Sequence, residues 1–446
     1  MNKSEGLQPL ISRPTGPLTG TATVPGDKSI SHRALMIGAV SVGRTVITGL
    51  LEGEDVLATA AALRNLGVSI FREDAAYIIE GGGPGSLAAP SSVLDLGNSG
   101  TGARLLLGLL ATHPLVAQVT GDASLVERPM SRVIEPLSMM GAGFAARDGG
   151  RLPLTVTGAR LPVPIAYQLP VPSAQVKSSI LLAALNTPGA TTVIEPQATR
   201  DHTELMLQHF GARIDVRDEG EGARRITLEG QPELQARPVR VPGDPSSAAF
   251  PLVAAVITPG SEIVIPNVGI NPLRTGLFTT LIEMGAQVRF ENERSDAGEP
   301  VADLIVQGSR LHGVEVPAER APSMIDEYPI LAIAAGFADG PTTMKGLAEL
   351  RVKESDRLAA ITAGLSAIGV EFEESEDRLT VLGRGNSPPG GGTITSHFDH
   401  RIAMSFLVAG TATVNPVTID DGRTIATSFP GFEALMNGLG TDIGTT

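Results

Sequence analysis

The sequence predicts an α/β protein assembled from six similar units, and three observations support this fold class. A hexapeptide occurs twice, as Val24-Pro-Gly-Asp-Lys-Ser29 and as Val241-Pro-Gly-Asp-Pro-Ser246, and the two copies lie 217 residues apart. Six turn residues, each followed by a small and apolar helical stretch, recur along the chain at similar spacing. Six glycines at the ends of helical stretches recur with the same period, which is typical of a repeated structural unit.

The first series marks helix starts. Each hexapeptide places an Asp before a helical stretch, where its carboxylate accepts hydrogen bonds from the free N–H groups of the first turn. In the second copy, Pro245 stands at the first helical position, where its missing N–H costs nothing. The predicted starts are separated by 71, 75, 71, 82 and 73 residues, and they are Asp27, Asn98, Ser173, Asp244, Asp326 and Asp399.

The second series marks helix ends. An apolar residue precedes each glycine and a β-type stretch follows it, as at a glycine that ends a helix. The gaps are 74, 70, 74, 84 and 71 residues, and the glycines are Gly67, Gly141, Gly211, Gly285, Gly369 and Gly440. Two markers with one period predict six α/β units, each with two helices and several strands, three on either side of the second hexapeptide. Among the strands we expect residues 191–194, 225–228 and 417–419.

The composition excludes several classes of protein. A chain of 446 residues with 42% hydrophobic residues has enough apolar surface for a large core and two to three domains. It contains no run of about 20 apolar residues and no apolar segment near its start, so we expect a cytoplasmic protein that does not enter membranes. A net charge of −14 and 3% aromatic residues argue against nucleic acid as a partner. Cysteine is absent, which removes disulfides and thiol chemistry.

Positive side chains gather at the predicted helix starts. Of the 34 Lys and Arg residues, only five are lysines, and three of these lie in the motifs described below. Helix N-termini carry unpaired N–H groups and a partial positive charge, so several of them around one cleft would attract anions. Purely structural caps are the alternative. The cations at or just inside the starts are Lys28, Arg33, Arg104, Lys177 and Arg401.

Two motifs in the first half of the chain combine donors of different kinds. Lys28, Ser29 and Arg33 fall within the first turns of one predicted helix, so a cation and a hydroxyl can face the same side. Residues 173–177 offer hydroxyl, amide and ammonium donors, which suit a ligand with hydroxyls and a phosphate. Between them, residues 97–104 form a glycine-rich turn whose N–H groups can approach an anion closely.

Two motifs in the second half carry carboxylates. On one helix, Lys353 and Arg357 would face the same way with Glu354 adjacent, so anion binding and proton transfer could share a turn. An exposed helix with surface ion pairs is the alternative. Asp326 is either a helix cap or a group of the site. The sequence from His397 to His400 lacks the further ligands that a metal needs, so we expect no metal.

Six motifs in order resemble the 5-enolpyruvylshikimate-3-phosphate (EPSP) synthase family, and the resemblance covers essentially the whole chain. It implies the two-lobed enolpyruvyl transferase fold, in which each lobe has three βαβαββ units with helices inside and sheets outside. The lobes would be residues 23–241, and residues 1–22 together with 242–446, with the active site in the cleft between them. The motifs are residues 25–33, 97–101, 127–130, 173–178, 352–357 and 399–404.

The resemblance also implies a reaction and its residues. The substrates would be shikimate 3-phosphate and phosphoenolpyruvate, without a cofactor, in a monomer of the shikimate pathway to aromatic amino acids. Asp326, Glu354 and Lys28 would be catalytic. Shikimate 3-phosphate would be held by Lys28, Ser29, Arg33, Ser173, Ala174, Gln175 and Arg200, with Lys28 reaching both reactants. Phosphoenolpyruvate would be held by Arg128, Lys353, Arg357 and Arg401, with the backbone around Asn98, Gly100 and Thr101. Asp326 would also bind substrate.

Three positions set this chain within the family pattern. Thr427 stands where many members have Lys, and Glu349 stands where many have Asn. These two positions bear on how the second phosphate is held. The pattern resembles a divergent bacterial branch of the family. Gly100 is a position linked in the family to glyphosate, a competitor of phosphoenolpyruvate, and we expect the glycine to leave room for this inhibitor.

Two other classes of protein share a repeated α/β plan. A UDP-N-acetylglucosamine enolpyruvyl transferase is the nearer alternative, but it usually uses a loop cysteine, which this chain lacks. An RNA 3′-phosphate cyclase would need a surface suited to RNA, which a net charge of −14 disfavours.

Overall fold

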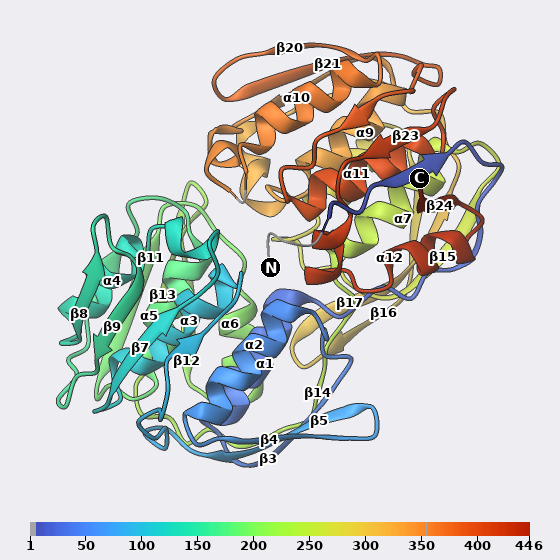
Figure 1. Ribbon diagram of the computed structural model, residues 1–446. Coiled ribbons are helices and arrows are strands. Elements are labelled where there is room, and N and C mark those ends of the chain that lie inside the picture. Colours follow the sequence, from blue (N-terminus) through green and yellow to red (C-terminus); the bar gives the residue numbers. More distant parts are fainter. Residues whose placement is uncertain (1–5, 354) are drawn as a thin grey trace. The chain divides into compact units, whose positions relative to one another are not determined.

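The chain divides into two compact units, each described by itself. Figure 1 shows the computed structural model, which describes residues 6–353 and 355–446. The segment Ser295–Glu299, which lies outside the predicted boundaries 23–241, groups with unit 2. Unit 1 contains the chain up to Pro25, Pro242–Arg294 and Pro300–Thr446, and unit 2 contains Gly26–Val241 and Ser295–Glu299.

Within the described residues, each unit contains three four-stranded sheets, and every sheet begins with a parallel pair of strands. The first sheet of unit 2 contains, in spatial order, β14 (Val239–Arg240), β3 (Val42–Thr48), β5 (Ala76–Gly82) and β4 (Ser69–Glu73). The second contains β6 (Leu94–Asp95), β7 (Val116–Thr120), β9 (Arg151–Thr157) and β8 (Gly143–Arg147). The third contains β10 (Ala166–Gln168), β11 (Ala190–Glu195), β13 (Ala223–Glu229) and β12 (Ile214–Gly220). The first sheet of unit 1 contains, in spatial order, β2 (Thr19–Thr21), β15 (Glu262–Gly269), β17 (Glu299–Gln307) and β16 (Gln287–Asp296). The second contains β18 (Glu315–Val316), β19 (Asp339–Lys345), β21 (Arg378–Arg384) and β20 (Glu371–Glu374). The third contains β22 (Thr393–Ile394), β23 (Val417–Ile419), β1 (Leu10–Arg13) and β24 (Asp442–Thr445).

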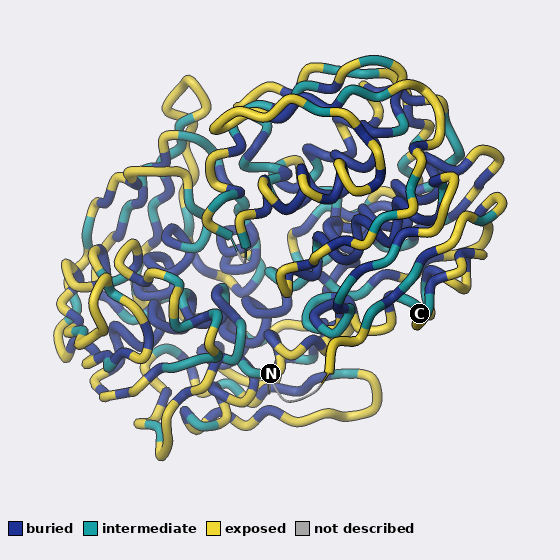
Figure 2. The backbone as a smooth tube through the Cα atoms, turned by 45° about the horizontal axis from the view of Figure 1, so that its top comes forward, coloured by how far each residue is buried: buried dark blue, intermediate teal, exposed yellow. Residues whose placement is uncertain are grey.

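Three helices in each unit are buried along most of their length and form the centre of that unit's core, as the dark blue coils in Figure 2 show. The small and apolar residues of these helices allow them to pack closely against their neighbours. The central helices are α1 (Lys28–Ala39), α3 (Gly100–Ala111) and α5 (Ala174–Ala184) in unit 2, and α7 (Pro245–Ile257), α9 (Tyr328–Phe337) and α11 (His400–Gly410) in unit 1. The others are α2 (Glu54–Asn65), α4 (Ser131–Met139), α6 (His202–His209), α8 (Gly276–Glu283), α10 (Arg357–Ala367) and α12 (Phe432–Gly438), with 3-10 helices η1 (Leu125–Glu127), η2 (Ala318–Ser323), η3 (Ala348–Val352) and η4 (Arg423–Thr427).

The predicted repeat is confirmed at its helix ends. Each of the six glycines follows a helix C-cap and adopts a positive φ between 78° and 109°, a conformation that only glycine takes without strain. The three predicted strands are also present, within β11, β13 and β23.

The helix starts are confirmed at four of the six predicted caps, where the side chain accepts a hydrogen bond from the first turn. The N-caps of the other two helices lie one residue later than predicted, at Ser99 and Glu327. The Ser99 hydroxyl accepts from Gly102 N, while the Asn98 amide is engaged with Asp122 and Arg128 instead. The four confirmed caps are Asp27, Ser173, Asp244 and Asp399.

The prediction of one helix through Lys353 and Arg357 is wrong. The 3-10 helix η3 ends at Val352, and α10 begins only at Arg357. Asp356 accepts a hydrogen bond from Ala359 N and so caps a new helix at this point. The two cations are therefore presented by a loop and a helix start, rather than by one helical face.

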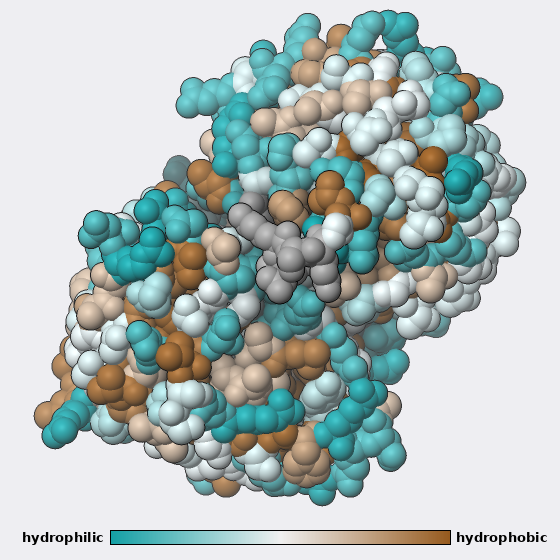
Figure 3. Space-filling model, in the orientation of Figure 1, coloured by the Kyte–Doolittle hydropathy of each residue, from teal (hydrophilic) through white to brown (hydrophobic). Residues whose placement is uncertain are grey.

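The described helices include none that is long and apolar enough to cross a membrane. On the face of the chain shown in Figure 3, apolar side chains appear as separate small groups among hydrophilic ones. Single exposed apolar residues are normal on protein surfaces.

Candidate active site

In unit 2, the start of α1 presents an ion pair. Lys28 is the first residue of the helix, and its Nζ lies 2.6 Å from Asp55 Oδ2 on α2. The Asp55 side chain is 9% exposed and that of Lys28 is 23% exposed, so the ammonium is held from one side and reaches solvent on another. Sequence reasoning missed Asp55, because nothing local links two residues that are 27 positions apart.

Arg33 lies one turn further into α1 and is buried. Its Nε donates to Thr203 Oγ1 at 2.7 Å, one terminal nitrogen donates to Ser29 O at 2.9 Å, and the other donates to Ser178 Oγ at 2.7 Å. Burial lowers the pKa of the guanidinium to about 10, with the Glu204 carboxylate opposing this effect. Arg33 therefore stays charged at neutral pH.

The start of α3 holds Arg128 in place. Asn98 Oδ1 accepts from Arg128 Nη2 at 2.7 Å, while Asn98 Nδ2 donates to Asp122 Oδ2 at 2.7 Å. A Cβ at Gly100 would lie 3.1 Å from Arg128 Nη1 and 3.3 Å from Arg104 Nη1. The glycine thus leaves room for two guanidinium groups beside the first turn of the helix.

Gln175 links the starts of α3 and α5. Its Nε2 donates to Thr101 Oγ1 at 3.0 Å, and its Oε1 accepts from Arg104 Nη1 at 2.8 Å. Ser173 caps α5 by accepting from Val176 N, and Ala174 is the first residue of this helix. The structure therefore brings two predicted motifs together within unit 2.

Lys177 does not present its ammonium as a ligand donor, contrary to the expectation that it contributes to an anion site. Its side chain is 0% exposed, and Nζ lies 3.1 Å from Glu195 Oε2 and 2.8 Å from Glu204 Oε1. Lysine is almost never fully buried unless it is paired. Its position in the sequence motif gave no signal of these two partners.

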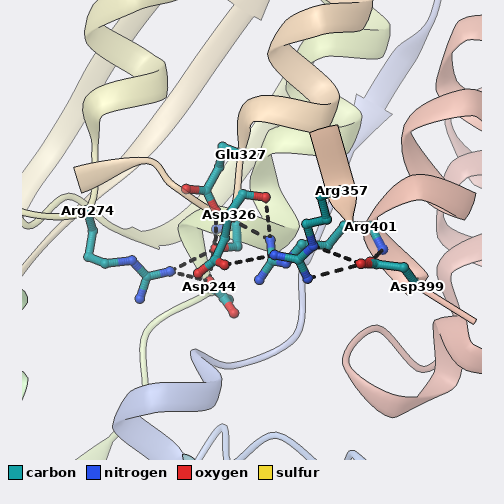
Figure 4. Close-up of polar contacts among 8 residues, drawn as sticks. Asp244, Arg274, Asp326, Glu327, Arg357, Asp399 and Arg401 are labelled. Atoms are coloured by element: carbon teal, nitrogen blue, oxygen red, sulfur yellow. Dashed lines mark hydrogen bonds and ion pairs between the residues drawn. The ribbon is translucent and has the colours of Figure 1, made fainter. Parts of the chain in front are cut away.

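In unit 1, Arg357 is fixed between two carboxylates (Figure 4). Its Nη1 lies 3.0 Å from Asp326 Oδ1, and its Nε lies 2.8 Å from Asp399 Oδ2. Asp399 also caps α11 by accepting from Arg401 N at 3.0 Å. One carboxylate therefore connects the helix starts that carry the two predicted arginines.

Arg401 contacts the residues that precede α9. Its Nη1 donates to Asp326 O at 3.3 Å and lies 3.4 Å from Glu327 Oε1 (Figure 4). Glu327 also accepts a hydrogen bond from Ser246 Oγ, in the second hexapeptide. Sequence reasoning missed Glu327, whose only signal was its position beside Asp326.

The second hexapeptide is itself held by a buried arginine that lies outside the predicted motifs. Arg274 Nη2 donates to Asp244 Oδ1 at 3.1 Å and to Ser246 Oγ at 2.9 Å. A chain of polar contacts thus runs from Arg274 through Ser246 and Glu327 to Arg401. Such a chain limits the orientations of the Arg401 guanidinium.

Lys353 follows η3 and is partly buried, and its ammonium has no hydrogen bond or ion pair with the other described residues. Glu354, the predicted proton-transfer residue, lies outside the described residues. Thr427 donates its hydroxyl to Thr424 O at 2.7 Å, inside η4. In the described part of the chain, no three His, Asp or Glu residues are grouped to hold a metal ion.

The family model described as EPSP synthase (3-phosphoshikimate 1-carboxyvinyltransferase) matches residues 12–436. The chain belongs to the EPSP synthase family. Its relatives include proteins named 3-phosphoshikimate 1-carboxyvinyltransferase from Paramagnetospirillum magneticum, 65% identical, and from Rhodospirillum rubrum, 60% identical. Each alignment covers 98% of this chain and 98% of the relative.

Solved structures agree with this family assignment. An EPSP synthase from Acinetobacter baumannii is 46% identical and superposes with a TM-score of 0.88, over 98% of this chain and 100% of that one. An enolpyruvyl transferase from Streptomyces tendae is only 20% identical, yet its TM-score is 0.76 over 99% of both chains. The predicted fold class, the two-lobed fold that EPSP synthase shares with other enolpyruvyl transferases, is thereby confirmed.

Proposed function

We propose that this protein transfers the enolpyruvyl group of phosphoenolpyruvate to the 5-hydroxyl of shikimate 3-phosphate and releases phosphate. The relatives that carry this enzyme name are 60% and 65% identical over nearly their whole length, which is the main support. The observation in the structure that carries the proposal is the fixed placement of Arg357 and Arg401 around Asp326 at one helix start.

The reaction proceeds by addition and elimination. The 5-hydroxyl gives its proton to a base as its oxygen forms a bond to C2 of phosphoenolpyruvate, while an acid supplies a proton to C3, which gives a tetrahedral intermediate. The bond from C2 to the phosphate oxygen then breaks, C3 loses a proton, and the double bond returns. Both steps need an acid and a base held close to the reacting atoms.

Shikimate 3-phosphate is assigned to residues of unit 2. We place its phosphate and hydroxyls against Ser173, Ala174, Gln175 and Arg200, with Lys28, Ser29 and Arg33 beside them. The junction that Gln175 makes between α3 and α5 supports this assignment, because it brings two helix N-termini together. Lys28 reaches both reactants in this proposal, and its partial exposure beside Asp55 is compatible with that role.

Phosphoenolpyruvate is assigned to four cations and to the first turn of α3. The cations are Arg128, Lys353, Arg357 and Arg401, and the backbone around Asn98, Gly100 and Thr101 supplies N–H donors. Each phosphate carries about −1.5 to −2 charge at neutral pH, and each substrate adds a carboxylate. Bringing these anions close together costs several kcal/mol without compensation, and the cations offset this repulsion.

Asp326 and Glu354 are proposed to share the proton transfers. Asp326 Oδ1 lies 3.0 Å from Arg357 Nη1, and this ion pair fixes the orientation of the carboxylate. Lys28 is the third catalytic residue of the proposal. A monomeric state in the cytoplasm stays a prediction from the sequence, and size-exclusion chromatography with light scattering would test the monomer.

The proposal is tested by incubating purified protein with phosphoenolpyruvate and shikimate 3-phosphate, without added metal, and following phosphate release. Mass spectrometry of the product should show the enolpyruvyl adduct. A parallel reaction with UDP-N-acetylglucosamine in place of shikimate 3-phosphate tests the alternative transferase. No phosphate release, or release only in the parallel reaction, would overturn the proposal.

A further inference from the structure

The buried lysine of α5 has no part in the proposed reaction, yet its surroundings are built around its charge. Lys177 Nζ contacts the carboxylates of Glu195 and Glu204 and donates to Thr199 O at 3.2 Å. Burying an ion is costly unless its partners compensate. An apolar side chain would fill the same space without that cost, so the contacts of Lys177 need an explanation beyond packing.

These contacts join both ends of one connection. Glu195 is the last residue of β11, and Glu204 lies in the first turn of α6. Thr199 lies between them, and its Oγ1 donates to Glu195 Oε2 at 2.7 Å. Lys177 therefore fixes the segment 196–201 from its beginning, through its middle, to the helix that follows.

Arg200 comes directly after the anchored carbonyl. The carbonyl of Thr199 and the N–H of Arg200 belong to one planar peptide unit, so a bond to that carbonyl orients the backbone from which the Arg200 side chain departs. The charge of Arg200 is also among those that act on Arg33, which places the two guanidinium groups near each other.

Glu204 connects the charges of Lys177 and Arg33. Glu204 lies 2.8 Å from Lys177, and it is the carboxylate that most strongly favours the charged form of Arg33. Burial raises the pKa of Glu204, and Lys177 opposes this rise. Loss of the lysine would leave Glu195 and Glu204 together without their shared partner, and the connection would rearrange.

We infer that Lys177 is a positioning residue that holds Arg200 in the orientation needed to bind the phosphate of shikimate 3-phosphate. The inference rests on the proposed function for the role of Arg200. It gives Lys177 no contact with either substrate, and it predicts that the main effect of losing Lys177 passes through Arg200.

The test compares Lys177→Met, Arg200→Ala and the double variant with wild type in steady-state kinetics. We expect Lys177→Met to raise KM for shikimate 3-phosphate by about tenfold to a hundredfold, since a displacement of about 1 Å is enough for such a loss. KM for phosphoenolpyruvate should change by less than about threefold. The exposed Lys345, paired with Glu315, supplies the control variant Lys345→Ala, which should match wild type.

The double variant decides whether the effect passes through Arg200. Residues that act through one another give non-additive effects, so the double variant should be no worse than Arg200→Ala alone. If the two losses multiply, or if a folded Lys177→Met keeps its KM for shikimate 3-phosphate within about twofold, the inference is wrong.

Two further measurements keep the test decisive. If circular dichroism shows that Lys177→Met does not fold, Thr199→Val takes its place, because it removes only the hydroxyl bond to Glu195. We expect Thr199→Val to raise KM for shikimate 3-phosphate by about threefold to tenfold, and the same criteria apply to it. Calorimetric titration with shikimate 3-phosphate gives Kd without turnover. If wild type releases no phosphate, the proposed function fails, whereas the Kd values of wild type and variant still decide the role of Lys177.

Discussion

Arg357 Nε lies 2.8 Å from Asp399 Oδ2, and both side chains are fully buried. Asp399→Ala removes one of the two carboxylates that pair with the buried guanidinium and also removes the cap of α11, so we expect it to lower the free energy of unfolding by about 3–5 kcal/mol. Urea unfolding followed by circular dichroism would measure this. Asp442→Ala breaks the exposed pair with Arg13 and should cost no more than about 1 kcal/mol. Equal losses in the two variants would contradict the prediction.

Glu327 should matter through Arg401. The Glu327 carboxylate is buried and accepts from Ser246 Oγ, with Arg401 Nη1 at 3.4 Å. We expect Glu327→Gln to raise KM for phosphoenolpyruvate by about tenfold, because a hydrogen bond to a charged group contributes about 1.5–3 kcal/mol. KM for shikimate 3-phosphate should change less. Steady-state kinetics with each substrate varied in turn checks this, and equal changes in both constants would argue for a general structural defect instead.

The local parts of the fold could be predicted from the sequence, because their chemistry is local. A cap such as Asp27 and a helix-ending glycine such as Gly67 satisfy backbone groups within four residues, so their signals are written in short stretches. The start at Ser99 rather than Asn98 was missed because the choice depends on Asp122 and Arg128, which lie 24 and 30 residues away from Asn98.

The direction in which a charged side chain points was the part that could not be predicted. Lys177 occupies a helix start just as Lys28 does, yet one is 0% exposed and the other 23% exposed. The difference is made by Glu195 and Glu204, which reach Lys177 from β11 and α6. Because these partners come from the tertiary fold, no spacing within the motif distinguishes a ligand donor from an internal ion pair.

Lys28 is predicted to contribute to turnover more than any exposed lysine. Loss of a single charged donor at a site of developing charge costs about a hundredfold to a thousandfold in kcat. We expect Lys28→Ala to show such a loss, while Lys345→Ala, which breaks only an exposed pair, stays near wild type. Phosphate release at saturating substrates measures both. Comparable turnover in the two variants would remove Lys28 from the mechanism.

Gly100→Ala tests the space beside Arg128. The new methyl would lie 3.1 Å from Arg128 Nη1 and 3.3 Å from Arg104 Nη1, so a guanidinium group must shift by a few tenths of an ångström. Overpacking costs about 1–3 kcal/mol, and we expect the inhibition constant for glyphosate to rise by about tenfold or more, with a smaller rise in KM for phosphoenolpyruvate. Gly438→Ala is the control, since a Cβ there meets nothing within 4 Å. An unchanged inhibition constant in Gly100→Ala would refute the steric explanation.

His32 should make the stability depend on pH. Complete burial is the main cause that lowers its pKa from 6.5 to about 3, and Lys28 and Arg33 add to this while Asp55 opposes it. Between these two pKa values the unfolded chain binds a proton that the folded chain does not, so stability is fully present above about pH 6.5 and falls as the pH drops towards 3.

The expected contribution of His32 between pH 7 and pH 5 is a loss of about 2 kcal/mol in the free energy of unfolding. Urea unfolding at both values measures the total, to which other groups add. His32→Gln removes the titrating ring and should reduce the loss by about that amount, whereas His312→Gln, at an exposed ring, is the matched control. The His32 ring is buried between the hydroxyls of Thr59 and Ser99, which lie 2.9 Å and 3.4 Å from its nitrogens. If wild type and His32→Gln show the same pH dependence, burial at this position does not hold the ring neutral.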